Sequence, residues 1–398
     1  ATDPKKKLEA EKSGAVLYRV RHISSTGEAG MISCKGPLGS RQHAAWLVGL
    51  VLLTAACAGK PPTRPTTEES LAAVQEYISS ARVTDDRGRF REIFCTVLED
   101  HGRNLPDYRP CDEALRLIGP EVGATAEPVP LARTGSNYLV LMVPGLGWNC
   151  FEDWLDLTYS VPGHLAEFGY EMRLIPVDGL SSTENNAAMI HDYVSGLPSE
   201  EADRRLILLG YSKGVPDILT ALVNYPSLAK RVDAVVSVAG AVGGSPLTED
   251  ATQAKANMLT VIPGSKCEEE HGDNDAVNSL RPDVRQAWLA QNTLPSNVRY
   301  YSAVTFPEPD RVSWALKNSY LVLGETDIRN DTQLVIFDQM IPGSRIFAVV
   351  NADHWAIAVP VSRSHSIVGG TLVNRNDYPR EAFVEALLRY VEEDISED

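Results

Sequence analysis

Residues 206–224 have the sequence LILLGYSKGVPDILTALVN, in which a Gly-x-Ser-x-Gly motif separates two apolar stretches. The first stretch, Leu206–Leu209, is short and continuously apolar, as in a strand buried on both faces of a sheet. After the motif, apolar side chains recur with helical spacing at Val215, Ile218, Leu219, Leu222 and Val223. Pro216 falls in the first turn of this helix, where a missing N–H costs little. The stretch therefore predicts a strand, a sharp turn at Ser212 and a helix.

Ser212 lies at the centre of this predicted turn, between Gly210 and Gly214. The two glycines allow the strand and the helix to approach more closely than side chains would permit. The motif alone is weak, because a chain of this length and composition contains one by chance roughly one time in seven. Its setting between a strand and a helix predicts that Ser212 is a nucleophile, since such a turn exposes a serine hydroxyl at the edge of a sheet.

From Tyr138 onward, short apolar runs alternate with amphipathic segments of helical spacing. This alternation predicts an α/β fold with a mostly parallel central sheet and helices on both faces. The expected strands are residues 138–143, 172–177, 206–209, 232–239, 298–304 and 345–350. An insertion at about 243–297 separates the fourth and fifth strands, and we expect it to form a lid. A final helix has an apolar face made by Phe383, Val384, Leu387, Leu388 and Val391.

A serine hydroxyl is a poor nucleophile at neutral pH unless a base accepts its proton and an acid orients that base. His354 directly follows the last expected strand and is the predicted base, with His365 and His271 as alternatives. Asp331, in a polar loop after the fifth strand, is the predicted acid. The carboxylates that stay open as alternatives are Asp327, Asp338, Asp310 and Asp250. Asp353 is expected to cap its own turn, because neighbours in an extended loop point apart.

Acyl transfer also needs donors for the oxyanion that develops on the substrate, and two backbone amides are expected. One is the amide of Lys213, the residue after the nucleophile. The other is the amide of Leu146, in the glycine-rich loop 144–148 after the first strand. This loop resembles the His-Gly loop of lipases, with Pro144 in place of the usual histidine.

These features, in this order, make residues 131–398 similar to the α/β-hydrolase superfamily. The runs GYSKGVPDILTALVNYP (210–226), AGAVGGSP (239–246) and NADHWAIA (351–358) further resemble a group of bacterial lipoprotein hydrolases. The resemblance implies an α/β-hydrolase fold and a serine hydrolase of esterase or lipase type. Such an enzyme would cleave ester or acyl-lipid substrates through an acyl-enzyme intermediate, with no metal and no cofactor. The alternatives are an acyltransferase with the same triad, a peptidase or amidase, and a catalytically silent envelope lipoprotein that only binds a ligand.

The N-terminal part of the chain carries a separate signature. Arg41 precedes a short apolar run, 44–56, whose length is typical of a signal-peptide core rather than of a membrane-spanning helix. Residues 53–57 resemble the lipobox of bacterial lipoproteins, which implies that Cys57 is lipidated and anchors the protein in the bacterial cell envelope. A plain cleaved signal, an uncleaved anchor and a buried helix are the alternatives. Because such signals begin a protein, Met31 is the expected start.

The expected organisation follows from these features and from the composition. The segments are a non-native leader (1–30), a lipoprotein-type signal peptide (31–56), a Pro/Thr-rich tether (57–70), a helical N-terminal extension (71–130) and the α/β-hydrolase domain (131–398). The formal net charge of −16 argues against nucleic acid as a partner, because phosphate binding needs clustered Lys and Arg.

Four cysteines follow the signal region, and an exported chain would oxidise them. We expect the disulfides Cys95–Cys111 and Cys150–Cys267, with free buried thiols as the alternative. The acidic run 267–275 lacks the spacing of a calcium-binding loop, so we expect it to be a solvated surface.

Overall fold

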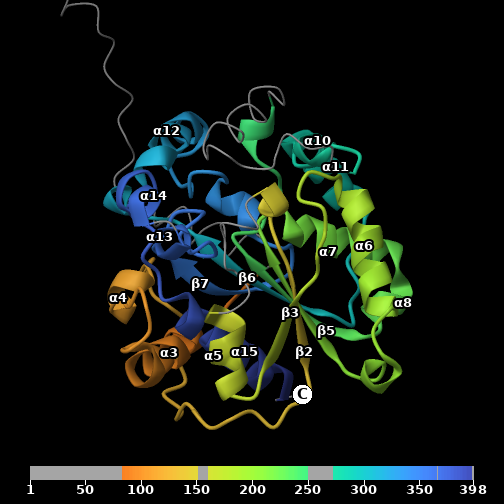
Figure 1. The fold of residues 1–398 in the computed structure, drawn as a ribbon, viewed down its shortest axis with the longest axis horizontal. Helices are drawn as coiled ribbons and strands as arrows, with labels where there is room; N and C mark the ends of the chain where they lie inside the picture. The colour runs from red at the N-terminus through yellow and green to blue at the C-terminus, as the bar shows by residue number, and fades with distance from the viewer. Residues whose placement is uncertain (1–82, 151–159, 250–271, 365, 397–398) are drawn as a thin grey trace, which may run out of the picture. The chain divides into compact units, whose positions relative to one another are not determined.

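A computed structural model describes residues 83–150, 160–249, 272–364 and 366–396. Within these residues, one sheet has the strands β1 Thr84–Asp85, β2 Leu139–Val143, β3 Glu171–Leu174, β4 Leu206–Tyr211, β5 Val232–Val238, β6 Arg299–Thr305 and β7 Arg345–Val350. Their order across the sheet is β1-β7-β6-β5-β4-β2-β3 (Figure 1). Every neighbouring pair is parallel, which confirms the predicted fold class.

The six expected strands are all present, and β1 is an addition. The largest displacement is in β3, which ends at Leu174 although an apolar run continues to Val177. β1 was not predicted because it has only two residues, one of them charged, and it exists through its pairing of Thr84 with Arg345 of β7. Such a short edge strand has no periodicity to detect.

Helices cover both faces of the sheet, as predicted. They are α3 Arg87–Val97, α5 Ser160–Glu167, α6 Thr183–Ser195, α7 Gly214–Asn224 and α15 Arg380–Ser396. Leu139 and Leu141 of β2 share an apolar cluster with Ile190 of α6 and Ile218 of α7. Val140, which points the other way, shares a cluster with residues of α3, α5 and α15. Figure 1 shows these two groups of helices on either side of the strands.

The sheet reverses its strand order between β2 and β4. β3 lies beyond β2 on one side, whereas β5, β6 and β7 lie beyond β4 on the other. Val143 at the end of β2 pairs with Gly210 near the end of β4, so the loops that follow these two strands begin side by side. In open parallel sheets, such a reversal at the carboxyl ends of the strands is where ligands bind. One of these loops contains Leu146, and the other contains Ser212.

Within the described part of the predicted helical N-terminal extension, residues 83–130, α3 packs into the core. Phe90 of α3 is fully buried, and its ring lies 4.7 Å from Phe347 of β7 and 5.6 Å from Phe383 of α15. Arg89 binds Glu393 of α15 at 2.6 Å. The predicted disulfide Cys95–Cys111 is present, between α3 and α4 (Cys111–Ala114). The second predicted pair lies outside the described residues, since Cys267 and the side chain of Cys150 are not described.

The insertion between β5 and β6 is described in part, and residues 250–271 fall outside the description. Its described elements are η6 Pro246–Thr248, α10 Ala276–Ser279 and α11 Pro282–Gln291. Arg285 of α11 is buried and donates from Nε to the carbonyl of Val242 at 3.3 Å, which attaches α11 to the loop after β5. The role of this insertion as a lid stays a prediction.

The remaining described elements are short. They are η2 Leu98–Gly102, η3 Trp148–Cys150, η5 Ser199–Glu201, α8 Pro226–Ala229, η7 Pro309–Arg311, η8 Trp314–Leu316, α12 Lys317–Thr326, η9 Ile336–Gln339, α13 Val361–Ser364 and α14 Ser366–Thr371. No helix among the described residues has the length and apolar character needed to cross a membrane. The expected leader, signal peptide and tether, residues 1–70, lie outside the description.

Candidate active site

Ser212 occupies a strained turn between β4 and α7. Its φ is +53°, a left-handed conformation that non-glycine residues rarely adopt and that costs about 1 kcal/mol or more. The turn brings strand and helix close together, since a Cβ on Gly214 would lie 2.1 Å from the carbonyl oxygen of Val143. A Cβ on Gly210 would lie 2.9 Å from the backbone of Val215. The two glycines of the motif are therefore required by the close approach that presents Ser212.

His354 and Asp331 lie next to Ser212 in a continuous hydrogen-bonded chain. His354 Nε2 is 2.9 Å from Ser212 Oγ, and His354 Nδ1 is 2.7 Å from Asp331 Oδ2. The amide of His354 also donates to the carbonyl of Asp331 at 2.9 Å, which connects the two loops. All three residues are buried. With Nδ1–H donating to the carboxylate, Nε2 is free to accept the serine proton.

The carboxylate of Asp331 is held by donors on both oxygens. Oδ1 accepts from the amides of Gln333 and Leu334, at 2.9 and 2.7 Å. Oδ2, the oxygen that faces His354, also accepts from Thr305 Oγ1 at 2.5 Å. Gln339 clamps Thr305 in turn, because its side chain accepts from the Thr305 amide at 2.7 Å and donates to the Thr305 carbonyl at 3.1 Å. These bonds fix the orientation of the acid.

The other candidate carboxylates lie elsewhere. Asp327 forms an ion pair with Arg329, and Asp310 is in η7. Asp338 makes no hydrogen bond to His354, and burial raises its pKa to about 6, with the Asp327 carboxylate adding to the effect. Asp353 accepts hydrogen bonds from the amides of its own turn and from the amide of Ser313, so it caps its turn as predicted. The remaining candidates, Asp250, His271 and His365, are outside the described residues.

Tyr211, the residue before the nucleophile, supports His354 from the other side. Its hydroxyl donates to the carbonyl of His354 at 2.6 Å, and its ring centroid lies 5.2 Å from the imidazole. This contact was not predicted, because the first variable position of a Gly-x-Ser-x-Gly motif accepts many residue types. Tyr211 thus joins the strand that carries the serine to the loop that carries the histidine.

One amide expected to bind an oxyanion belongs to Lys213, which follows Ser212 in sequence, and the other belongs to Leu146 in the loop 144–148. The loop 144–148 touches the nucleophile, since a Cβ on Gly145 would lie 3.0 Å from Ser212 Cβ. Gly147 donates its amide to the carbonyl of Gly179 at 2.9 Å. Among the hydrogen bonds of the described residues, none uses the amide of Leu146 or that of Lys213. Both amides are therefore available to an acceptor from a ligand.

Lys213 has a second feature that was not predicted. Its side chain is 1% exposed, and Nζ lies 2.8 and 2.9 Å from the two oxygens of Asp217, one turn further along α7. Asn186 of α6 donates to the same carboxylate at 2.8 Å. Burial raises the pKa of Asp217 to about 6, although the ammonium group of Lys213 opposes the rise. A buried ion pair thus lies at the start of α7, and one of its members follows the nucleophile directly in sequence.

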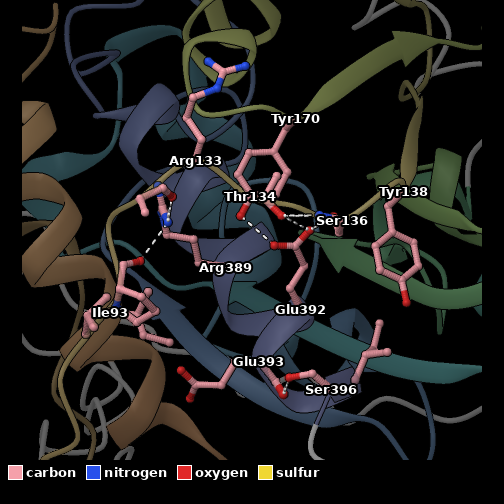
Figure 2. A pocket seen from close by; sticks show the side chains of 14 residues that line it. Ile93, Arg133, Thr134, Ser136, Tyr138, Tyr170, Arg389, Glu392, Glu393 and Ser396 are labelled. Atoms are coloured by element: carbon pink, nitrogen blue, oxygen red, sulfur yellow. Dashed lines mark hydrogen bonds between the residues drawn. The ribbon is translucent and has the colours of Figure 1, made fainter.

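A pocket of about 630 Å³ lies at the opposite edge of the sheet (Figure 2). Tyr138 and Tyr170, which line it, precede β2 and β3, so it lies at the amino ends of these strands. Glu392 of α15 accepts from the hydroxyls of Thr134, Ser136 and Tyr170 across this pocket. The pocket is separate from Ser212, which lies at the carboxyl end of β4. No group of described His, Cys, Asp or Glu residues is placed to hold a metal ion.

The chain is similar to several solved esterase and lipase structures. The metagenomic carboxyl esterase MGS0156 is 35% identical, covers 81% of this chain and 99% of its own, and has a TM-score of 0.73. The mature lipase BlEst2 of Bacillus licheniformis is 19% identical, with coverage of 61% and 94% and a TM-score of 0.47. The Staphylococcus hyicus lipase is 12% identical, with coverage of 68% and 100% and a TM-score of 0.47. No family model and no curated protein sequence matches the chain.

A parallel sheet with a serine on a strained turn after a central strand, and a histidine after the last strand, defines an α/β-hydrolase fold. The similarity to the metagenomic esterase covers almost all of that protein. The chain belongs to the carboxylesterase family of α/β-hydrolases, and it is a hydrolase of the carboxylesterase or lipase type.

Proposed function

We propose that Ser212, His354 and Asp331 form a catalytic triad that hydrolyses a carboxylic ester through an acyl-enzyme intermediate. The observation that carries the proposal is the unbroken chain of hydrogen bonds from Ser212 Oγ through both nitrogens of His354 to Asp331. The three residues come from three separate loops at the carboxyl ends of β4, β6 and β7. Such convergence of buried polar groups has no packing advantage, because buried polar groups are costly unless they are satisfied.

In this mechanism, Ser212 Oγ attacks the ester carbonyl while its proton moves to His354 Nε2. The resulting oxyanion accepts hydrogen bonds from the amides of Leu146 and Lys213. The tetrahedral intermediate collapses, and His354 gives its proton to the departing alcohol. Water then attacks the acyl-serine while His354 Nε2 takes a proton from it, and His354 returns this proton to Ser212 Oγ as the carboxylic acid product leaves. Asp331 keeps Nδ1 protonated throughout and stabilises the positive charge on the imidazole.

The proposed substrates are carboxylic esters, including esters of acyl lipids. The family supports an ester, because a relative of 35% identity is described as a carboxyl esterase. A panel of nitrophenyl esters of increasing chain length would define the acyl preference. Ser212→Ala is expected to abolish turnover of every ester in the panel, and an organophosphonate is expected to modify Ser212 in the folded protein. Normal turnover by Ser212→Ala would end the proposal.

The role of Asp331 has its own test. Asp331→Asn keeps the shape of the side chain but favours the wrong histidine tautomer, so kcat is expected to fall by about 10³- to 10⁴-fold. KM is expected to change little, because Asp331 lies behind His354 and away from Ser212. Near-normal turnover by this variant would assign the acid to another residue.

We further propose that the protein is exported and anchored through a lipid on Cys57, with residues 31–56 as the signal peptide and 57–70 as the tether. The apolar run 44–56 and the lipobox-like residues 53–57 support this. The Cys95–Cys111 disulfide also supports export, because structural disulfides persist in oxidising compartments. Labelled palmitate should enter the wild-type chain and not Cys57→Ala, and only the wild type should sediment with membranes. Equal labelling of both chains would contradict the anchor.

A further inference from the structure

The two proposed oxyanion donors lie on different segments of the chain. Lys213 belongs to the turn after β4, whereas Leu146 belongs to the loop after β2. A donor is effective only when its distance to the oxyanion is correct to a few tenths of an ångström, so the two segments need a fixed relative position. A series of buried polar contacts connects the turn that contains Lys213 to the loop that contains Leu146.

The connection begins at the side chain of Lys213. Its ammonium group is held by both oxygens of Asp217, and the two side chains are 1% and 0% exposed. Because Lys213 has the nucleophile on one side and α7 on the other, this ion pair fixes the peptide whose amide faces the oxyanion. A buried ion pair is on average no more stabilising than apolar packing of the same volume. Its presence here calls for a geometric explanation rather than an energetic one.

Asn186 carries the connection from Asp217 to a neighbouring turn. Its Nδ2 donates to Asp217 Oδ2 and to the carbonyl of Asp178, both at 2.8 Å. Its Oδ1 accepts from the amide of Asp178 at 3.2 Å. The side chain is fully buried. Its amide group forms hydrogen bonds to the N–H and the carbonyl of Asp178 and to the Asp217 carboxylate at the same time. Asn186 therefore fixes the turn after β3 relative to α7.

That turn holds the loop that contains Leu146. Gly179 accepts from the amide of Gly147 at 2.9 Å and donates to Asn149 Oδ1 at 3.2 Å. The contact is tight, because a Cβ on Gly179 would lie 2.8 Å from the amide nitrogens of Gly147 and Trp148. Trp148 Nε1 adds a bond of 2.6 Å to the carbonyl of Val177. The loop after β2 thus rests on the turn that Asn186 holds.

We propose that Asn186, together with the Lys213–Asp217 ion pair, is a positioning group that sets the relative placement of the Lys213 and Leu146 amides. The inference rests on the proposed function, because it assigns those two amides to the oxyanion. Asn186 touches no reacting atom, and it acts through Asp217 on one side and through Asp178 on the other. Its loss weakens binding of the tetrahedral state more than binding of the ester.

The test replaces Asn186 with Leu and uses Asn185→Leu as the matched control. Asn185 is the neighbouring residue of α6, is exposed, and contacts Ser181 instead of Asp217. For Asn186→Leu, kcat for a nitrophenyl ester is expected to fall about 10- to 100-fold, part of the loss that follows removal of a whole donor. KM should stay within a factor of about three. The inhibition constant of an alkyl boronic acid, which forms a tetrahedral adduct with Ser212, should rise by the same factor as kcat falls.

A second variant makes the test independent of how well Asn186→Leu folds. Lys213→Met with Asp217→Leu removes the ion pair without leaving one charge buried alone, and it keeps the backbone amide of residue 213. We expect the same parallel loss of kcat and of boronic-acid affinity. Unchanged kcat in either folded variant, or a loss of kcat with unchanged boronic-acid affinity, would overturn the inference. Failure of the proposed function is distinguishable, because it appears as activity in Ser212→Ala.

Discussion

Asp338 carries a charge that the fold disfavours, and replacing it with Asn should stabilise the protein. Among the described residues, no hydrogen bond or ion pair reaches its carboxylate. The group lies against the loop after β5, since a Cβ on Gly243 would be 2.3 Å from Asp338 Oδ1. Burial and the nearby Asp327 carboxylate raise the pKa of Asp338 from 3.8 to about 6. The neutral amide of Asp338→Asn has the same shape and none of this cost.

The size of the effect follows from the shift in pKa. A rise from 3.8 to about 6 corresponds to about 3 kcal/mol, at 1.36 kcal/mol for each pH unit. The folded state binds the proton more tightly than the unfolded state, so the protein loses stability as the pH rises from about 4 to about 6. Above this window the full cost is present, and below it the cost disappears. Asp338→Asn should therefore be up to about 3 kcal/mol more stable at pH 8 and within about 1 kcal/mol of wild type at pH 4.

Thermal unfolding of both proteins at pH 8 and pH 4 measures this difference. The melting temperature of Asp338→Asn should be higher by roughly 5 °C at pH 8, for a domain of this size, and almost unchanged at pH 4. Esterase turnover at pH 8 should stay within about a factor of two of wild type, because Asp338 does not contact His354. An equal difference at both pH values, or a less stable variant at pH 8, would refute the reasoning.

Three further outcomes follow from the structure. Thr305→Val removes the hydroxyl donor to the Asp331 carboxylate and should lower kcat about tenfold with KM unchanged, whereas Thr305→Ser should retain activity in the same assay. Replacing Cys95 and Cys111 with Ala should lower the stability by about 3 kcal/mol in denaturant titrations, and reduction of the wild type should have the same effect. Phe90→Ala should cost about 3 to 5 kcal/mol in the same titrations, because Phe90 is fully buried among other aromatic rings.

The sheet could be predicted because its central strands are buried on both faces. Runs such as Leu206–Leu209 are short and continuously apolar, which is typical of parallel strands that are covered on both faces. The turn at Ser212 could be predicted because two glycines flank it between a strand and a helix. β1 could not be predicted, since it depends on its partner β7 rather than on its own residues.

The acid that orients His354 could not be chosen from the sequence alone. Asp327, Asp331 and Asp338 all follow β6 and precede β7, so the sequence alone allows any of them to be the acid. Only the folded loop shows that Asp331 faces His354 while Asp327 binds Arg329. The position of Arg329, two residues after Asp327, was the available signal.

The sequence also contained part of the information needed to predict the positioning group formed by Asn186, Lys213 and Asp217. Lys213 and Asp217 are opposite charges four residues apart at the start of an otherwise apolar helix, a spacing that lets them pair. Burial of that helix on all sides then predicts that the pair is buried too. Helical spacing places Asn186 on the same face of α6 as Ile190 and Val194, which was the available signal that it points inward. Its partner Asp217 follows only from the packing of α6 against α7.

The contact between α3 and α15 affects when the native core can form during synthesis of the chain. Arg89 and Glu393 are 304 positions apart, and Phe90 packs on rings from β7 and α15. Because ribosomes synthesise α3 before β7 and α15, Phe90 cannot contact Phe347 or Phe383 until these later segments have been made. Contacts this distant in sequence slow folding, and transiently exposed apolar side chains such as Phe90 favour aggregation in the meantime.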